Sequence, residues 1–279
     1  MSNPFPRTTV GGVSLPRILI GTNWFLGYSH QTPAKDRAIK ARHCRNSIAE
    51  VLEVFLAEGI DAIMGPSNPL LKEAADEAES RTGKKVIRIL TPSFSILPDE
   101  PAEQSPEAML DQARDLGATF CMPHQCVTDR LLDKLHFKIR DLPKYTKMIR
   151  DRGMIPGLST HTPESIVFSD KNDYDVETYI QLYNSAGFLM QVEVDWIMRI
   201  ISNAKKPVMT IKPFAAGRIA PAIALPFVWN TIREQDMVTV GTTTPDEARE
   251  VIDISRDILA GRIPGGELQA TRSKAVLKY

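Results

Sequence analysis

The stretch from Met154 to Gly217 decides the fold. It reads MIPGLSTHTPES from Met154, YDVETYIQLYNSAG from Tyr174 and KPVMTIKPFAAG from Lys206. Each piece contains an apolar run that ends in small and polar residues, and helical segments lie between the runs. This is the rhythm of consecutive strand–helix units in a (β/α)8 barrel, where the strand ends carry the chemistry.

The same alternation extends over the rest of the chain. Segments with helical periodicity separate the strand-like runs, which implies parallel strands, and eight units favour a closed barrel over an open sheet. No linker or low-complexity block divides the sequence. We therefore predict an α/β fold, a single (β/α)8 TIM barrel that spans 1–279 as one domain. The predicted strands are 18–23, 61–65, 85–91, 118–124, 155–161, 176–184, 207–213 and 237–243.

Local signals mark the ends of several elements. The N-terminal TTVGGVSLP predicts a β-hairpin that turns at Gly11–Gly12. The segment 47–59 places its apolar residues on one helical stripe, and the long polar loop 24–46 is expected to lie over the barrel mouth. A polar residue before proline predicts four helix starts, the last with the spacing of a capping box to Glu247. These starts are Asn68–Pro69, Ser105–Pro106, Thr162–Pro163 and Thr244–Pro245.

The composition excludes several classes of function. Among 279 residues, 34 basic and 34 acidic side chains balance to zero net charge, so nucleic acid and anionic membranes are not expected partners. Apolar runs end well short of the ~20 residues of a membrane span, and the N-terminus lacks the apolar core of a signal peptide. Three cysteines are too few for a disulfide framework. We expect a cytoplasmic protein with a small-molecule substrate, and its oligomeric state stays open.

Several of these segments resemble the aldo-keto reductases. The similar pieces are GLSTHTPES, YDVETYIQLYN, KPVMTIKPFAAGRI and WNTIREQDMVTVGTTTPDEAREV, together with the hairpin that leads into ILIGTNWFLG. In that family, polar residues ending the fifth and sixth strands hold the nicotinamide carboxamide, and Ser159 and Gln181 match them. The fourth strand of the family ends in a catalytic histidine, which matches His124.

The other three residues of the family's catalytic tetrad are not matched. The segment GIDAIMGPSNPLLKEA contains no Tyr and has Met64 where the family has Asp, and Thr91 stands where it has Lys. Hydride transfer to a carbonyl needs a proton donor, a role that Tyr fills when Lys and His lower its pKa. The TPDEA turn after the eighth strand also carries acidic residues, where the family has basic residues on the phosphate side of its cofactor site. We therefore expect weak or absent NAD(P)H binding.

Two histidines, His124 and His161, would end neighbouring strands on the catalytic face of the barrel. They could share acid–base work or ligate a metal, or each could be a hydrogen-bonded part of the scaffold. A divalent metal would need further ligands, and no diagnostic spacing supplies them. No metal site is therefore predicted, and His30 with the two strand-end histidines would be the ligands if one exists.

Basic residues near the seventh strand could stabilise negative charge on a substrate. Lys212 could form a Schiff base or neutralise an oxyanion, or it could serve the scaffold. Arg218 and Thr242 in the GTTT turn could make an anion pocket, against the alternative of a plain capped helix. Asn23 and Trp24, with Gln181, are expected to line the mouth.

The leading hypothesis is an enzyme on a small polar substrate, sugar-like or phosphorylated, with isomerase, lyase or aldolase-like chemistry. His124 would be the acid or base, shared with His161, and Lys212 or Arg218 would stabilise negative charge. One alternative is an NAD(P)-dependent aldo-keto reductase-type oxidoreductase with rearranged donors, supported by Ser159, Gln181 and His124. Another is a non-catalytic metabolite-binding barrel.

Overall fold

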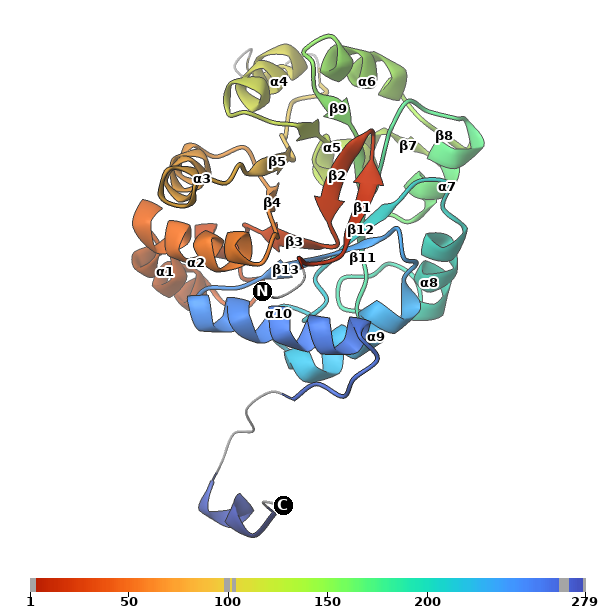
Figure 1. The fold of residues 1–279 in the computed structure, drawn as a ribbon. Coiled ribbons are helices and arrows are strands. Elements are labelled where there is room, and N and C mark those ends of the chain that lie inside the picture. Colours follow the sequence, from red (N-terminus) through yellow and green to blue (C-terminus); the bar gives the residue numbers. More distant parts are fainter. Residues whose placement is uncertain (1–3, 98–100, 102–103, 266–270, 278–279) are drawn as a thin grey trace.

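A ring of parallel strands surrounded by helices forms the body of the protein (Figure 1). The structure, a computed structural model, describes residues 4–97, 101, 104–265 and 271–277. All eight segments predicted as barrel strands contain strands of this sheet, and their neighbours pair in parallel, so the predicted TIM barrel is confirmed. The strands, in their order in the sheet, are β10 (Leu158–Ser159), β11 (Tyr179–Leu182), β12 (Val208–Ile211), β13 (Met237–Gly241), β3 (Ile18–Gly21), β4 (Ala62–Gly65), β5 (Ile87–Leu90), β6 (Phe120–Cys121) and β9 (Ile155–Pro156).

The ring closes through the fifth barrel strand, which Gly157 divides into β9 and β10. The first half pairs with β6 and the second half with β11. Gly157 donates its N–H to the carbonyl of Cys121 at 3.3 Å, and Leu158 donates to Thr178 at 3.0 Å. A Cβ atom at Gly157 would lie 2.7 Å from Cε of Met122. A larger residue at this position would therefore force the side chain of Met122 to move.

The predicted N-terminal hairpin covers one end of the barrel. Its strands are β1 (Arg7–Val10) and β2 (Val13–Pro16), and Gly11 and Gly12 make the turn with φ of 53° and 81°. Val10 and Leu15 are buried against the side chains that fill the barrel interior. Within the described residues, the hairpin thus closes the interior at its N-terminal end. The interior cluster comprises Leu19, Ala62, Met64, Ile89, Phe120, Met122, Ile180, Met209 and Met237 besides the two hairpin residues.

Helices cover the outside of the barrel through apolar stripes. The stripe predicted over 47–59 is buried on α2, and each such side chain stabilises the fold by about 1.5–3 kcal/mol. The helices are α1 (Pro33–Arg42), α2 (Arg45–Ala57), α3 (Pro69–Thr82), α4 (Pro106–Asp115), α5 (Gln125–Leu131), α6 (Leu142–Arg150), α7 (Glu164–Lys171), α8 (Val194–Asn203), α9 (Pro221–Thr231) and α10 (Pro245–Leu259), with the 3-10 helices η1 (Trp24–Leu26) and η3 (Arg272–Leu277).

Three of the four predicted helix starts are confirmed. Asn68, Ser105 and Thr244 each accept a backbone N–H of the first turn. The prediction for Thr162 was wrong, because α7 begins at Glu164 and the Thr162 hydroxyl lies 3.3 Å from Gln191 instead.

The capping box predicted at α10 was also wrong. The carboxylate of Glu247 accepts from the N–H and hydroxyl of Thr243, at 2.6 and 2.8 Å, and not from the N–H of the cap residue Thr244. The side chain of Glu247 therefore binds Thr243, whereas in a capping box it would bind the N–H of the cap residue Thr244.

Two segments contain structure that the sequence reasoning did not predict. The loop 24–46 folds into η1 and α1, and a second hairpin joins β7 (Leu132–Asp133) to β8 (Lys138–Ile139). In the described ranges, no helix combines the length and apolar character that crossing a membrane requires.

Candidate active site

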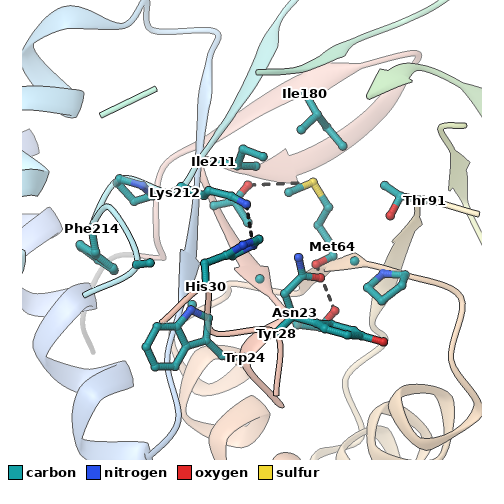
Figure 2. Close-up of a pocket in the computed structure, with 18 of the residues that line it drawn as sticks. Asn23, Trp24, Tyr28, His30, Met64, Thr91, Ile180, Ile211, Lys212 and Phe214 are labelled. Carbon is teal, nitrogen blue, oxygen red and sulfur yellow. Dashed lines mark hydrogen bonds between the residues drawn. The ribbon is translucent and has the colours of Figure 1, made fainter. Parts of the chain in front are cut away.

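A cavity of about 760 Å³ opens at the carboxyl ends of the barrel strands (Figure 2). This is the face on which barrel enzymes carry their chemistry. Most of the residues proposed from the sequence meet there, while Gln181 and Arg218 are not part of its wall. The proposed residues that line it are Asn23, Trp24, His30, His124, Ser159, His161, Lys212 and Thr242.

Lys212 stands at the end of β12 with its side chain in the cavity, where Figure 2 shows it directed toward His30. Its backbone is left-handed, with φ of 59°, which turns the chain away from the strand direction. Ile211 and Phe214 line the same part of the wall. Burial lowers the pKa of Lys212 to about 8, and in the described part of the chain it makes no ion pair with a carboxylate. Near neutral pH the amine can therefore gain or lose a proton.

His30 reaches the cavity from the loop that follows β3. Its Nε2 atom lies 2.9 Å from Nζ of Lys212, and its backbone is also left-handed, with φ of 55°. Two contacts fix the loop: Gln31 donates to the carbonyl of Ala216 at 2.8 Å, and Arg218 donates to the carbonyl of His30 at 3.4 Å. Burial and then the charge of Lys212 lower the pKa of His30. The imidazole is therefore neutral at pH 7 and can accept a hydrogen bond from the ammonium group.

His124 lies at the end of the fourth barrel strand and caps α5, as expected for a residue at the mouth. Its Nδ1 atom accepts the N–H of Cys126 at 3.3 Å and lies 3.0 Å from the Cys126 sulfur, which in turn is 3.1 Å from the hydroxyl of Ser93. Burial, followed by the charge of Lys212, lowers the pKa of His124. A neutral imidazole with Nδ1 as acceptor carries its proton on Nε2. His124 can therefore donate a hydrogen bond from Nε2.

His161 lines the cavity from the loop after β10. Its backbone N–H donates to Asp129 at 3.1 Å, and the same carboxylate accepts the hydroxyl of Thr160 at 2.6 Å. Burial, then the charges of Lys212, His124 and His30, lower the pKa of His161 to about 4. At neutral pH this imidazole is uncharged and can donate one hydrogen bond and accept another.

The tetrad positions of the resembled family hold other residues. Met64 and Thr91, both nearly buried, line the cavity where that family has Asp and Lys. A tyrosine nevertheless reaches the cavity from another element: Tyr28, in the loop after η1, is 52% exposed. Figure 2 shows its ring along the rim, beside Asn23. Sequence reasoning did not single out Tyr28, although it lies in the loop that was expected to cover the mouth.

The region after β13 differs from the anion pocket suggested by Arg218 and Thr242. The guanidinium of Arg218 stacks on Phe188, 4.3 Å from the ring centroid, and donates to the carbonyl of Ala215 at 3.0 Å. The hydroxyl of Thr242 is buried and has no hydrogen-bond partner among the described residues. Glu247 and Glu250 of α10 line this side of the cavity. This side of the cavity therefore presents the hydroxyl of Thr242 and the carboxylates of Glu247 and Glu250, while the guanidinium of Arg218 packs on Phe188.

Gln181 is fully buried on β11. Its amide nitrogen donates to the carbonyl of Leu182 at 3.3 Å, and its side-chain oxygen has no partner in the described part of the chain. Ser159, the other residue that matches the carboxamide-binding pair of the resembled family, does line the cavity. Within the described ranges, no three His, Cys, Asp or Glu side chains gather as a metal site would require.

No protein-family model matches the sequence, and no curated protein does so either. Solved structures share the fold at low identity. A protein from Pseudomonas aeruginosa assigned to the aldo-keto reductases is 14% identical with a TM-score of 0.64, covering 91% of this chain and 96% of its own. An aldo-keto reductase from Brucella melitensis is 13% identical with a TM-score of 0.56, covering 97% and 96%. One from Klebsiella pneumoniae, in complex with NADP and acetate, is 13% identical with a TM-score of 0.54, covering 95% and 98%. In its fold, this chain is a (β/α)8 barrel similar to that of these aldo-keto reductase structures.

Proposed function

We propose that the protein is an oxidoreductase that acts on the carbonyl group of a small polar molecule. The observation that carries this proposal is Lys212, a buried amine with a pKa of about 8 that faces a cavity at the catalytic end of the barrel. Reduction of a carbonyl needs an acid that releases a proton near neutral pH. Lys212 meets this requirement although the tyrosine and lysine of the usual tetrad are missing.

The similar structures favour this class over the isomerase, lyase or aldolase-like chemistry that led the sequence hypotheses. They are named as reductases, and the one from Klebsiella pneumoniae contains NADP. Fold likeness at this identity does not carry a reaction by itself. Carbonyl reduction therefore depends on whether the cavity suits a nicotinamide cofactor and a carbonyl compound.

The cavity wall fits the polar parts of a nicotinamide cofactor. The hydroxyls of Thr242 and Ser67 are buried there without a partner among the described residues, so each can bind a polar group of a ligand. A Cβ atom at Gly241 would lie 3.0 Å from Cδ1 of Trp24, so the glycine lets the indole ring pack closely against the end of β13 in the cavity wall. Ser159 would serve the carboxamide, and Glu250 suits ribose hydroxyls better than an additional phosphate.

The side chains divide the work on the substrate. Thr242, Ser67 and Ser159 would hold the nicotinamide cofactor, which would supply or accept the hydride. His124 donates its Nε2 proton in a hydrogen bond to the carbonyl oxygen and orients it. Lys212, in its ammonium form, transfers a proton to the oxygen as negative charge develops there. His30, 2.9 Å from Nζ, holds the amine in place by accepting a hydrogen bond.

The test is the oxidation of NADH and NADPH in the presence of short aldehydes and 2-oxo acids. Wild-type protein should turn over at least one such compound, and Lys212→Met should lose about 10² or more of the rate. Lys138→Met, which removes an exposed lysine of β8, is the matched control and should keep full activity. If no cofactor is oxidised, and borohydride with an aldehyde instead adds mass at Lys212, a Schiff-base enzyme replaces the proposal.

A further inference from the structure

One side of the cavity gathers basic side chains from separate loops. His30 comes from the loop after β3, His161 from the loop after β10, and Lys212 from the end of β12. All three line the same cavity, and none forms an ion pair with a carboxylate among the described residues. Carbonyl reduction requires only one proton donor and one orienting donor. The cavity therefore contains more basic side chains than carbonyl reduction needs.

A positive charge on one of these three groups disfavours protonation of the others. Lys212 contributes to the lowered pKa values of His30 and His161, and His30 contributes to that of His161. Two cations in such a site repel, so in the free protein the histidines remain neutral. An anion placed between them would remove this opposition and would gain charge-assisted hydrogen bonds from each group.

The nearby acidic groups are committed to other partners. Asp36, which lies near His30, accepts hydrogen bonds from Ser29. Asp129, near His124, is held by Thr160 and the His161 backbone.

Three further charged groups lie near the cavity on other elements. Glu247 is bound by Thr243, Glu250 lines the side formed by α10, and the Arg218 guanidinium rests on Phe188. Among the described residues, no carboxylate forms an ion pair with Lys212, His30 or His161.

We propose that the substrate carries an acidic group, a carboxylate or a phosphate, and that this group binds against the ammonium of Lys212, beside His30 and His161. The inference rests on the proposed function for the carbonyl, because His124 remains free to bind the carbonyl oxygen beside the anion. The substrate class is then a small oxo acid or phosphorylated carbonyl compound. The anion site itself requires neither cofactor nor turnover, so it can be tested alone.

Anion binding should be coupled to proton uptake. Lys212, with a pKa of about 8, is half deprotonated near pH 8 in the free protein. A bound anion favours the ammonium form and raises that pKa, so the complex holds more protons than the free protein. Binding at pH 8 should therefore take up about half a proton from the buffer, a signal that nonspecific surface binding would not produce.

The experiment is calorimetric titration of the whole protein at pH 8 with oxalate, inorganic phosphate and oxamide, the uncharged diamide of oxalate. Each titration is repeated in two buffers with different enthalpies of ionisation, which gives the number of protons taken up. We expect saturable binding of at least one anion, no detectable binding of oxamide, and proton uptake. The stronger of the two anions identifies the acidic group as carboxylate or phosphate.

Variants locate the site. Lys212→Met should weaken anion binding at least tenfold and abolish proton uptake, Lys212→Arg should retain binding without uptake, and His161→Gln should weaken it less than Lys212→Met. Lys138→Met is the control for a lost lysine elsewhere. Equal binding of oxamide, unchanged binding in Lys212→Met, absence of proton uptake, or absence of binding by both anions overturns the inference. None of these negative outcomes would contradict the proposed oxidoreductase function, because the protein could still reduce neutral carbonyl compounds.

Discussion

Nζ of Lys212 lies 2.9 Å from Nε2 of His30, although the two residues are 182 positions apart in the chain. Both have left-handed backbones, with φ of 59° and 55°, a conformation that costs a residue with a side chain about 1–3 kcal/mol. Such strain persists where the surrounding structure imposes it, and it clusters at functional sites. The meeting of two such residues inside one cavity supports the proposal that this mouth is the active site.

The first prediction concerns the dependence of rate on pH. If Lys212 donates the proton, kcat/KM for carbonyl reduction should be level below its pKa of about 8 and fall about tenfold per pH unit above it, because only the ammonium form is active. Lys212→Arg should move this fall to higher pH. Initial rates between pH 6 and 10 give the profile, and a wild-type rate that rises above pH 8 would exclude Lys212 as the acid.

The second prediction concerns His124 and its partner Cys126. His124→Ala should reduce turnover by about 10² with the fold intact, since general acid–base and orienting groups contribute that much. Cys126→Ala removes the sulfur 3.0 Å from Nδ1 but keeps the backbone N–H that also bonds it. It should lower the rate by less than tenfold. Steady-state kinetics and circular dichroism test both variants, and full activity in His124→Ala would make this histidine a part of the scaffold.

The barrel and much of its mouth could be predicted from sequence because both follow from local signals. Alternating apolar runs and helical stripes place the strands, and strand ends carry the candidates, so His124 and Lys212 were found where barrel geometry puts them. Pairing between distant loops has no such signal. The contact of His30 with Lys212 depends on how the loop 24–46 folds over the mouth.

Side-chain direction was equally beyond sequence reasoning. Gln181 sits on a barrel strand yet is sealed from the cavity, and Arg218 turns aside to stack on Phe188. Tyr28 was missed because nothing in the strand pattern indicates how an irregular loop aims a single ring. In each case the deciding contacts come from residues far away in the chain or from loop geometry, which neither periodicity nor capping signals encode.

The third prediction concerns cofactor preference. Glu247 and Glu250 at the start of α10 place negative charge beside the cavity, so NADH should bind more tightly than NADPH, whose extra phosphate they repel. Glu250→Gln should improve NADPH binding about 2- to 5-fold and change NADH binding less, because the amide can still bind a ribose hydroxyl. Titrations followed by tryptophan fluorescence, with Trp24 in the cavity wall, measure both. Glu73→Gln on α3 is the control, and a wild-type preference for NADPH would contradict the assignment.

The fourth prediction concerns a buried carboxylate that joins two strands. Asp236 is fully buried and accepts the N–H of Val208 at 2.8 Å, the N–H of Arg233 at 2.9 Å, and that residue's guanidinium at 2.7 and 2.8 Å. Asp236→Ala leaves two backbone donors without an acceptor and the half-buried guanidinium of Arg233 without its carboxylate, although it keeps its bonds to the carbonyls of Ala204 and Lys206. The free energy of unfolding should fall by about 3–5 kcal/mol. Urea unfolding measures it, and a loss below 1 kcal/mol would show that water replaces the carboxylate.

The last prediction concerns stability in acid and follows from His161. Burial and three neighbouring basic groups lower its pKa to about 4 in the folded protein, against an ordinary value of 6.5. As the pH falls through 6.5, the unfolded chain takes up a proton at this position and the folded chain does not. Stability should therefore be fully present above about pH 6.5 and decline between 6.5 and 4. His30, His43 and His124, whose pKa values are also lowered, act in the same direction.

Replacing His161 by glutamine removes one of these contributions, so His161→Gln should lose less stability than the wild type when the pH is lowered from 7.5 to 5. Urea unfolding at the two pH values measures the difference directly. The exposed His136, which bonds Asp133 at 2.8 Å, offers the control variant His136→Gln. An acid-induced loss in His161→Gln equal to that of the wild type would mean that His161 titrates normally and is open to water. The mutual repulsion among the basic groups of the cavity, on which the anion site depends, would then be absent.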